Sequence, residues 1–339
     1  MNFCWLLSAV FIVSLFLTYV LRRYALANSL IDIPNLRSSH TLPTPRGGGV
    51  AIVVSFLLAL PVLYYLDLID LSVFAGLLGA GALVAALGFA DDHGHIAARW
   101  RLLGHFVAAG WALFWLGGGP QISFFGVLLN LNWFATILFA VFLVWMLNLY
   151  NFMDGIDGLA SVEAISVCLS GCLVYWLSGH QELSWVVWVL ASSVAGFLCW
   201  NFPPARIFMG DAGSGFLGLT VGLLAIIAAT KVPELLWCWL ILLGVFIVDA
   251  TWTLMRRLLR GEKIYEAHRS HAYQYASRQY GNHKTVVYAV LAINLLWLAP
   301  LAVAVGAGLI PGVAALIIAY TPLLLIAYKY QAGMLEPAK

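Results

Sequence analysis

Long runs of apolar residues alternate with short polar segments along this chain. A membrane-spanning helix needs about 20 predominantly apolar residues. Eleven runs approach that length, at approximately 3–21, 48–66, 72–90, 102–118, 132–150, 158–178, 184–200, 214–230, 235–255, 285–305 and 311–328. No internal repeat and no soluble domain interrupts them. The pattern predicts an all-α, polytopic membrane protein of about eleven transmembrane helices, forming a single domain over residues 1–339.

Composition supports lipid as the solvent of this chain. Of its residues, 63% are hydrophobic and only 9% are charged, whereas a soluble domain carries about a quarter charged residues. The net charge of +2 gives no indication of a nucleic-acid partner, and none is expected. The five cysteines lie within apolar runs without metal-ligand spacing, which is typical of core packing.

Basic residues predict the orientation of the spans. If the N-terminus is periplasmic, sixteen of the seventeen Lys and Arg residues fall on the cytoplasmic side, with Lys231 as the exception. Such an asymmetry follows the positive-inside rule. The first apolar run is expected to be a retained span and not a signal peptide, because Arg22-Arg23 follows it. The C-terminus is then cytoplasmic, and the polar segments face the cytoplasm at 91–101, 148–158, 201–213 and 256–284.

The most unusual polar segment places Asn148, Asn151, Asp154 and Asp157 within eleven residues. Asp157 has two interpretations, as a cap of the helix that follows or as part of a binding site. Capping does not explain the other three side chains, which would have to face a wet cavity. The positive end of the following helix also favours a phosphate there.

Two further acidic positions have a structural and a functional interpretation. Asp91-Asp92 closes the third apolar run, either as a solvated loop start neutralised by His93, His95, Arg99 and Arg101 or as a site for Mg²⁺ or a proton acceptor. Asp211 lies among small residues before the eighth run. It either caps that helix or ligates a metal beside an anion-binding helix start.

The loop 256–284 is the most basic segment of the chain. Its charge follows partly from the positive-inside rule and from attraction to anionic lipid. His268, Arg269 and His271 would in addition form a phosphate clamp if they were helical. Within the spans, Asp249 is costly, at about 2.5–3.5 kcal/mol on insertion scales. We therefore expect Asp249, and similarly Glu163, to face the protein interior with a partner.

These motifs occur in a known order. Asp91-Asp92, the Asn-x-x-Asn-x-x-Asp-Gly-x-Asp-Gly run at 148–158, Phe-Met-Gly-Asp-Ala-Gly-Ser at 208–214 and the His/Arg segment 268–271 follow one another. Together they resemble the polyprenyl-phosphate N-acetylhexosamine-1-phosphate transferases, over residues 32–284. The resemblance implies transfer of a sugar-1-phosphate from a UDP-sugar to undecaprenyl phosphate in the bacterial inner membrane, with release of UMP. It also implies a requirement for Mg²⁺, with Mn²⁺ as an alternative, and leaves a homodimer open.

The resemblance also implies roles for individual residues. Asn151 and Asp211 would be metal ligands. Asp91 would be the base for the lipid phosphate or the nucleophile of a two-step scheme, supported by Asp92. The remaining positions would bind the nucleotide (Asn148, Asp154 and Asp157, with Asp157 nearer the uracil) or the phosphates (His268, Arg269 and His271).

One departure from the family pattern bears on the substrate. The peptidoglycan branch has three consecutive histidines where this chain has His268-Arg269-Ser270-His271, which argues against a muramyl-pentapeptide donor. The chain looks most similar to members that initiate O-antigen assembly, whose donors are UDP-N-acetylhexosamines or their 6-deoxy forms. Two rival classes are a transporter or flippase, which should carry its polar groups near the midplane, and an intramembrane aspartyl protease, whose motif is incomplete here.

Overall fold

The computed structural model describes residues 3–34, 42–94, 96–262 and 268–334. Its α-helices are α1 (Cys4–Ala27), α2 (Val50–Tyr65), α3 (Leu71–His93), α4 (Ala98–Trp115), α5 (Trp133–Met153), α6 (Leu159–Ser178), α7 (Ser184–Asn201), α8 (Asp211–Lys231), α9 (Leu235–Leu242), α10 (Gly244–Leu259), α11 (Ala272–Tyr280), α12 (His283–Ile293), α13 (Ala299–Gly306) and α14 (Gly312–Lys329). A 3₁₀ turn, η1 (Gln181–Leu183), and a π-helical turn, η2 (Asn294–Leu298), complete the helical elements. Two short antiparallel pairs join β1 (Ile31–Asp32) to β2 (Thr44–Pro45) and β3 (Ile122–Phe124) to β4 (Val127–Leu129).

Each of the eleven predicted spans contains a helix, so the all-α prediction is confirmed. Within the described residues, eight helices are long and apolar enough to cross a bilayer, and nine if α9 and α10 count as one bent span. The 16-residue α2 is shorter, and α4 is not among the eight. The number of eleven spans and their orientation stay predictions.

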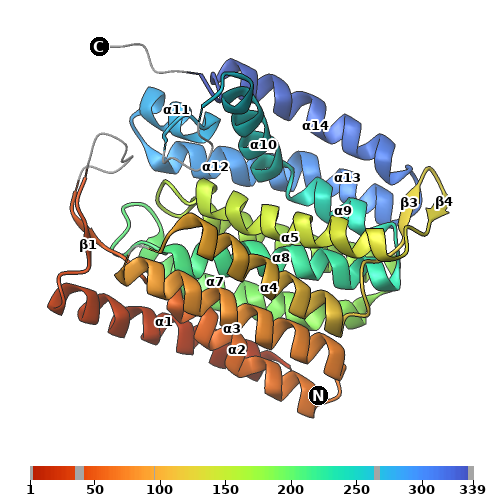
Figure 1. Cartoon of the computed structure of the whole chain (residues 1–339), viewed down its shortest axis with the longest axis horizontal. Coiled ribbons are helices and arrows are strands. Elements are labelled where there is room, and N and C mark those ends of the chain that lie inside the picture. Colours follow the sequence, from red (N-terminus) through yellow and green to blue (C-terminus); the bar gives the residue numbers. More distant parts are fainter. Residues whose placement is uncertain (1–2, 35–41, 95, 263–267, 335–339) are drawn as a thin grey trace.

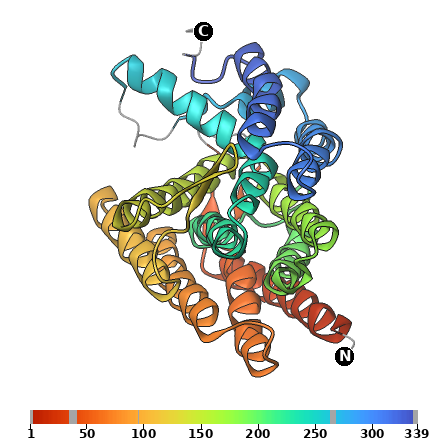
Figure 2. The ribbon, with the colours of Figure 1, turned by 90° about the vertical axis from the view of Figure 1, so that its right-hand side faces the viewer.

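Helix α8 forms the centre of the bundle. Figure 2 shows it nearly end-on, surrounded by the other helices, and α3 and α5 pack along it. Small residues make this close packing possible, as is usual between membrane helices. A Cβ added at Gly218 would lie 2.3 Å from the carbonyl oxygen of Met146 on α5, and one added at Gly213 would lie 2.6 Å from the Cα of Gly49. The glycines of α8 therefore fix its distance from its neighbours.

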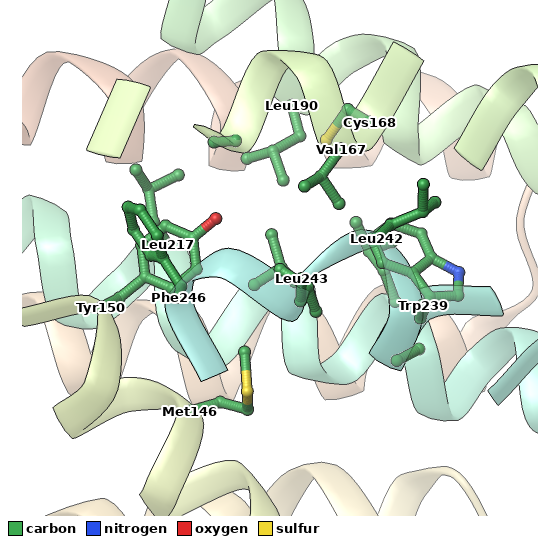
Figure 3. Packing of buried hydrophobic residues seen from close by; sticks show 14 of the residues in the cluster. Met146, Tyr150, Val167, Cys168, Leu190, Leu217, Trp239, Leu242, Leu243 and Phe246 are labelled. Atoms are coloured by element: carbon green, nitrogen blue, oxygen red, sulfur yellow. The ribbon is translucent and has the colours of Figure 1, made fainter. Parts of the chain in front are cut away.

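The ninth predicted span is not a continuous helix, which corrects the sequence prediction. Helices α9 and α10 meet at Leu243 with a bend of 70°. Gly244 lets α14 approach the break, since an added Cβ would lie 3.1 Å from Leu323. The hydroxyl of Tyr320 donates to the carbonyl of Leu240, 2.7 Å away, and so satisfies a group that the break releases. Figure 3 shows Leu243 packed among buried apolar side chains at this corner.

Glu163 faces the interior with a partner, as predicted. Its side chain on α6 is fully buried, and the amide of Asn294 donates to its Oε2 at 2.6 Å. The same amide donates to Ser166 at 2.8 Å. Asn294 begins the π-helical turn η2, a type of distortion that often places a side chain off the regular helical position. This polar contact ties α6 to the C-terminal helices.

The predicted polar segments lie together at one end of the bundle. Figure 1 shows β1 and α11 at the left-hand end and the β3–β4 hairpin at the right-hand end. Backbone hydrogen bonds join two distant segments at the left-hand end: Gly48 donates to Phe208, and Phe208 donates to Pro45. Segments far apart in the sequence therefore meet next to the start of α8.

Candidate active site

The two adjacent acids at the end of α3 point to different partners. The Asp92 carboxylate accepts hydrogen bonds from the backbone amides of Asp211, at 3.1 Å, and Ala212, at 3.3 Å. These are the first two residues of α8, so Asp92 satisfies amides that a helix start leaves without intrahelical partners. Its side chain is buried. Asp92, and not Asp211, therefore caps α8, and the capping interpretation of Asp211 is wrong.

Asp91 joins α4 to the start of α8 through an arginine. Arg101 forms an ion pair with Asp91, and the same guanidinium nitrogen lies 3.6 Å from Asp211 Oδ2. Asp91 Oδ1 also accepts from the backbone amide of Ile96 at 2.8 Å. The interpretation of Arg101 as a neutralising partner is confirmed, whereas His95 lies outside the described residues. Arg101 stands between two carboxylates and offsets part of their mutual repulsion.

Asp211 connects this corner to α5. The amide nitrogen of Asn151 donates to Asp211 Oδ1 at 2.8 Å and to Ser214 Oγ at 3.0 Å. Asn151 lies in the last turn of α5, and Asp211 is the first residue of α8. The structure thus brings together Asp91, Asn151 and Asp211, which lie within a span of 120 residues along the chain.

Asp154 lies just beyond α5 and adds a further acid to this group. Burial raises the pKa of Asp154 well above its usual range, and the nearby carboxylates of Asp211 and Asp92 raise it further. No hydrogen bond or ion pair reaches its carboxylate from the part of the chain that the structure describes. A cation would relieve the repulsion that this arrangement imposes.

Asp157 does not cap α6, which excludes the capping interpretation. The N-cap residue is Gly158, with φ of 74°, and its backbone amide donates to Asn201 Oδ1 at 3.0 Å. Asp157 Oδ2 instead accepts from the amide of Ala205 at 2.9 Å and lies 3.3 Å from His283 Nδ1. Asp157 therefore joins the loop 201–213 to the start of α12.

A cavity opens beside Asp157. Its volume is 520 Å³, and its lining combines Pro203, Pro204 and Phe208 with the basic side chains of Arg278 and Lys284. Apolar and cationic groups in one open cavity suit a ligand that carries both a planar apolar face and negative charge.

The histidine segment is not helical, which corrects the premise of the predicted clamp. Helix α11 begins only at Ala272, after both histidines. Their rings nevertheless stack, with centroids 4.9 Å apart, and both pack near Phe152 of α5. Burial, together with the neighbouring His271 and Arg257, lowers the pKa of His268 to about 3. The proximity of the two histidines was predicted, whereas their stacked arrangement was not.

Two predicted residues are less closely tied to this group. The amide of Asn148 donates to the carbonyl of Val144, one turn back in α5, at 2.7 Å. Arg269 lies between the two histidines in the sequence, and its backbone carbonyl accepts a hydrogen bond from the Arg278 side chain. Their predicted roles in nucleotide and phosphate binding stay predictions.

Comparison with known proteins assigns the family. Residues 74–229 match glycosyl transferase family 4. The chain is 32% identical over 303 residues to a probable undecaprenyl-phosphate N-acetylglucosaminyl 1-phosphate transferase of Bacillus subtilis (strain 168), covering 85% of this chain and 82% of the relative. The chain belongs to glycosyl transferase family 4. The resemblance inferred from the motifs is confirmed.

Two other family 4 relatives differ in what they are named for. An undecaprenyl-phosphate alpha-N-acetylglucosaminyl 1-phosphate transferase of Thermotoga maritima is 29% identical over 294 residues, which cover 85% of this chain and 87% of the relative. A phospho-N-acetylmuramoyl-pentapeptide-transferase of Streptococcus pneumoniae (strain Taiwan19F-14) is 31% identical over 244 residues, which cover 66% of this chain and 71% of the relative. The family match runs from α3 to α8, so it contains Asp91, Asn151 and Asp211.

The donor set of this family 4 chain fits a hard cation bound with a ligand. Among the described residues, no three Asp, Glu, His or Cys side chains come close enough to surround an ion by themselves. Mg²⁺ is usually held by one or two protein carboxylates together with substrate phosphates and waters. Asp211 and Asn151 offer such a partial set, and the carboxyl group of Asp154 lies nearby.

Sequence reasoning missed one residue that organises this end of the family 4 fold. Tyr273, on α11, donates its hydroxyl to the carbonyl of Phe152 at 2.9 Å. An added Cβ at Gly155 would lie only 2.2 Å from that hydroxyl oxygen. The sequence holds a faint signal of this contact, because a glycine beside Asp154 indicates a close approach, but it does not say by which segment.

Proposed function

We propose that this protein transfers an N-acetylhexosamine-1-phosphate, or its 6-deoxy form, from a UDP-sugar to undecaprenyl phosphate, with release of UMP. The observation that carries the proposal is the position of Asp211, which contacts Asn151 directly, lies 3.6 Å from Arg101 and has its backbone amide held by Asp92. The relatives from B. subtilis and T. maritima, which are named for transfer to undecaprenyl phosphate, each match 85% of the chain.

The reaction joins two phosphate-bearing substrates. A phosphate oxygen of the lipid forms a bond to the β-phosphorus of the donor, and the bond between that phosphorus and the bridging oxygen breaks. UMP leaves with the bridging oxygen and its electron pair. Bringing several negative charges together is the main obstacle, so positioning and electrostatic stabilisation supply most of the catalysis.

The groups around Asp211 suit that task. Asp211 and Asn151 would hold Mg²⁺, or Mn²⁺ in its place, which would neutralise the charge of the bridging diphosphate. Arg101, held by Asp91, places a permanent cation beside the same carboxylate. Asp92 accepts from the first two amides of α8 and so fixes the position of Asp211. We assign Asp91 to the lipid-phosphate side of the site, as proton acceptor or as nucleophile of a two-step scheme.

The donor nucleotide would occupy the cavity beside Asp157. Phe208 lines this cavity together with the basic side chains of Arg278 and Lys284, a combination that suits a uracil base and its phosphates. His268, Arg269 and His271 would contact phosphates from the side of α11. Asp154 and Asn148 would border the nucleotide from α5.

The site would face the cytoplasm from the bacterial inner membrane. UDP-sugars are cytosolic, and in the predicted orientation sixteen of the seventeen Lys and Arg residues would lie on the side that holds the polar segments, in agreement with the positive-inside rule. The segment His268-Arg269-Ser270-His271 differs from the three consecutive histidines of the peptidoglycan branch. We therefore propose that the product starts lipopolysaccharide O-antigen assembly and not peptidoglycan.

A donor panel tests this proposal. Purified protein is offered UDP-N-acetylglucosamine, UDP-N-acetylgalactosamine, their 6-deoxy forms and UDP-N-acetylmuramyl-pentapeptide, each with undecaprenyl phosphate, and UMP is measured. We expect UMP and a lipid-linked product with one of the first four donors. Turnover of the muramyl-pentapeptide alone would contradict the substrate assignment. The absence of UMP with every donor, together with transport of a lipid-linked sugar across vesicles, would favour a flippase.

A further inference from the structure

Asp249 is the one deep acid of α10, and the structure confirms that it faces the interior with partners. Its side chain is buried. Its Oδ1 accepts from the hydroxyl of Thr253 at 3.2 Å and from the backbone amide of Ala272 at 2.9 Å. Its Oδ2 accepts from the backbone amide of Tyr273 at 3.0 Å. A carboxylate that costs free energy to bury is therefore fully engaged.

Two of these donors are the first residues of α11. Ala272 and Tyr273 begin that helix, and their amides have no partner within it. Asp249 thus caps α11 from a different helix, with its negative charge at the positive end of the α11 dipole.

The same carboxylate orients His271. Nδ1 of His271 lies 3.3 Å from Asp249 Oδ1, and the ring is buried. A carboxylate accepts hydrogen bonds only, so a hydrogen bond in this contact requires the proton on Nδ1. The second ring nitrogen, Nε2, is then directed away from Asp249. A carboxylate behind a functional histidine commonly fixes its ring orientation and tautomer in this way.

Helix α11 is fixed on its other side to α5. The ring of His271 stacks on Phe152 with centroids 6.3 Å apart, and Tyr273 donates to the Phe152 carbonyl. Phe152 directly follows Asn151 in the sequence. A continuous series of contacts therefore runs from Asp249 through α11 to the turn that carries Asn151 and Asp154.

We propose that Asp249 is a positioning residue, which holds His271 and the start of α11 against the Asn151–Asp154 turn so that the histidine segment meets the donor phosphates. This inference rests on the proposed function. Asp249 contacts no substrate itself and acts through His271. An asparagine at position 249 would supply only one acceptor oxygen. Its NH₂ group would then face the backbone N–H of Tyr273, and two donors cannot form a hydrogen bond with each other.

A double-mutant cycle tests the coupling. Asp249→Asn, His271→Ala and the double variant are compared by kcat and KM for the donor identified by the panel. We expect each single variant to lose about 10- to 100-fold in turnover, as for other carboxylates behind functional histidines. The double variant should lose no more than His271→Ala, since both substitutions break one unit. Losses that multiply would overturn the proposal.

A second readout does not depend on activity. Hydrogen–deuterium exchange of full-length protein in nanodiscs should rise within residues 268–280 in Asp249→Asn and stay unchanged elsewhere. Unchanged exchange in that segment, or faster exchange throughout the protein with a matching loss of thermal stability, would overturn the positioning role. A wild-type protein inactive with every donor would refute the proposed function, while this readout would still decide whether Asp249 holds α11.

Two variants complete the design. Thr251→Val is the matched control, because its buried hydroxyl on α10 has no hydrogen-bond partner in the described part of the chain. We expect wild-type exchange and turnover. If Asp249→Asn cannot be obtained folded, Tyr273→Phe breaks the link from the α5 side. Faster exchange in 268–280 and reduced turnover would support the proposal, and wild-type values for both would overturn it.

Discussion

Oδ1 of Asp92 lies 3.1 Å from the backbone nitrogen of Asp211. This contact joins the end of α3 to the start of the central helix. It depends on Gly88, since a Cβ there would lie 2.5 Å from the Cα of Ala212. The two adjacent acids therefore have different roles. Asp92 accepts hydrogen bonds from the first amides of α8, whereas Asp91 forms an ion pair with Arg101.

Removal of the Asp92 cap should destabilise the protein. Asp92→Ala leaves two buried amides of α8 without acceptors, and loss of a helix cap costs about 0.5–2 kcal/mol. Asp92→Asn keeps one acceptor oxygen and should cost less. Thermal unfolding of the solubilised protein measures both. An unchanged midpoint in Asp92→Ala would contradict the capping role.

The contact of Gly155 with α11 should tolerate no side chain. In Gly155→Ala the new Cβ would lie 2.2 Å from the Tyr273 hydroxyl oxygen. Since Tyr273 is buried, stacks on His271 and donates its hydroxyl to the Phe152 carbonyl, we expect a loss of about 1–3 kcal/mol and a displaced α11. The matched control is Gly110→Ala, where an added Cβ meets nothing within 4 Å. It should be neutral or slightly stabilising. Equal thermal midpoints for the two variants would contradict the contact.

The buried pair of Glu163 and Asn294 should behave as a unit. Asn294→Leu removes the donor to Glu163 Oε2 and leaves a buried polar group unsatisfied, at a cost of about 1–3 kcal/mol. The double variant Glu163→Leu/Asn294→Leu removes both partners and should recover most of that loss. Thermal unfolding of the two single variants and the double variant checks this. A double variant that is less stable than either single variant would show that the contact is not a closed pair.

Stability should depend on the protonation of His268. The pKa of His268 is lowered by burial to about 3, from 6.5, so the folded protein binds fewer protons than the unfolded chain between these values. The contribution of this residue to stability is therefore complete above pH 6.5 and is lost as the pH falls toward 3. Thermal midpoints measured from pH 7 to pH 4 should fall less steeply in His268→Gln than in the wild type. A steeper fall in the variant would contradict the burial of a neutral ring.

The sequence predicted much of the helix content because apolar run length is a local property. It also indicated Asp91, Asn151, Asp154 and Asp211 as candidate site residues, since isolated polar groups between apolar runs need a reason to be there, and the structure brings them together. It could not predict the break at Leu243, which depends on Gly244 meeting α14 and on the hydroxyl of Tyr320. Such contacts exist only in three dimensions.

The capping roles show the same limit at single residues. Asp157 and Asp211 each stand where a cap is expected, yet the acceptors for α6 and α8 come from Asn201 and Asp92. Both acceptors lie more than 40 residues away in sequence. The sequence rule for helix caps therefore locates the helix start correctly but names the wrong acceptor. In the fold, the carboxylates of Asp157 and Asp211 contact other partners.

The proposed function depends most on Asp211 as part of a metal-bound diphosphate site. The most direct measurement is Mg²⁺-dependent UMP release by Asp211→Asn at wild-type protein level, with undecaprenyl phosphate and the preferred UDP-sugar. The control is Asp67→Asn, an exposed acid in the loop after α2. We predict that Asp211→Asn releases no UMP at any Mg²⁺ concentration while Asp67→Asn remains fully active. Full activity of Asp211→Asn would contradict the assignment.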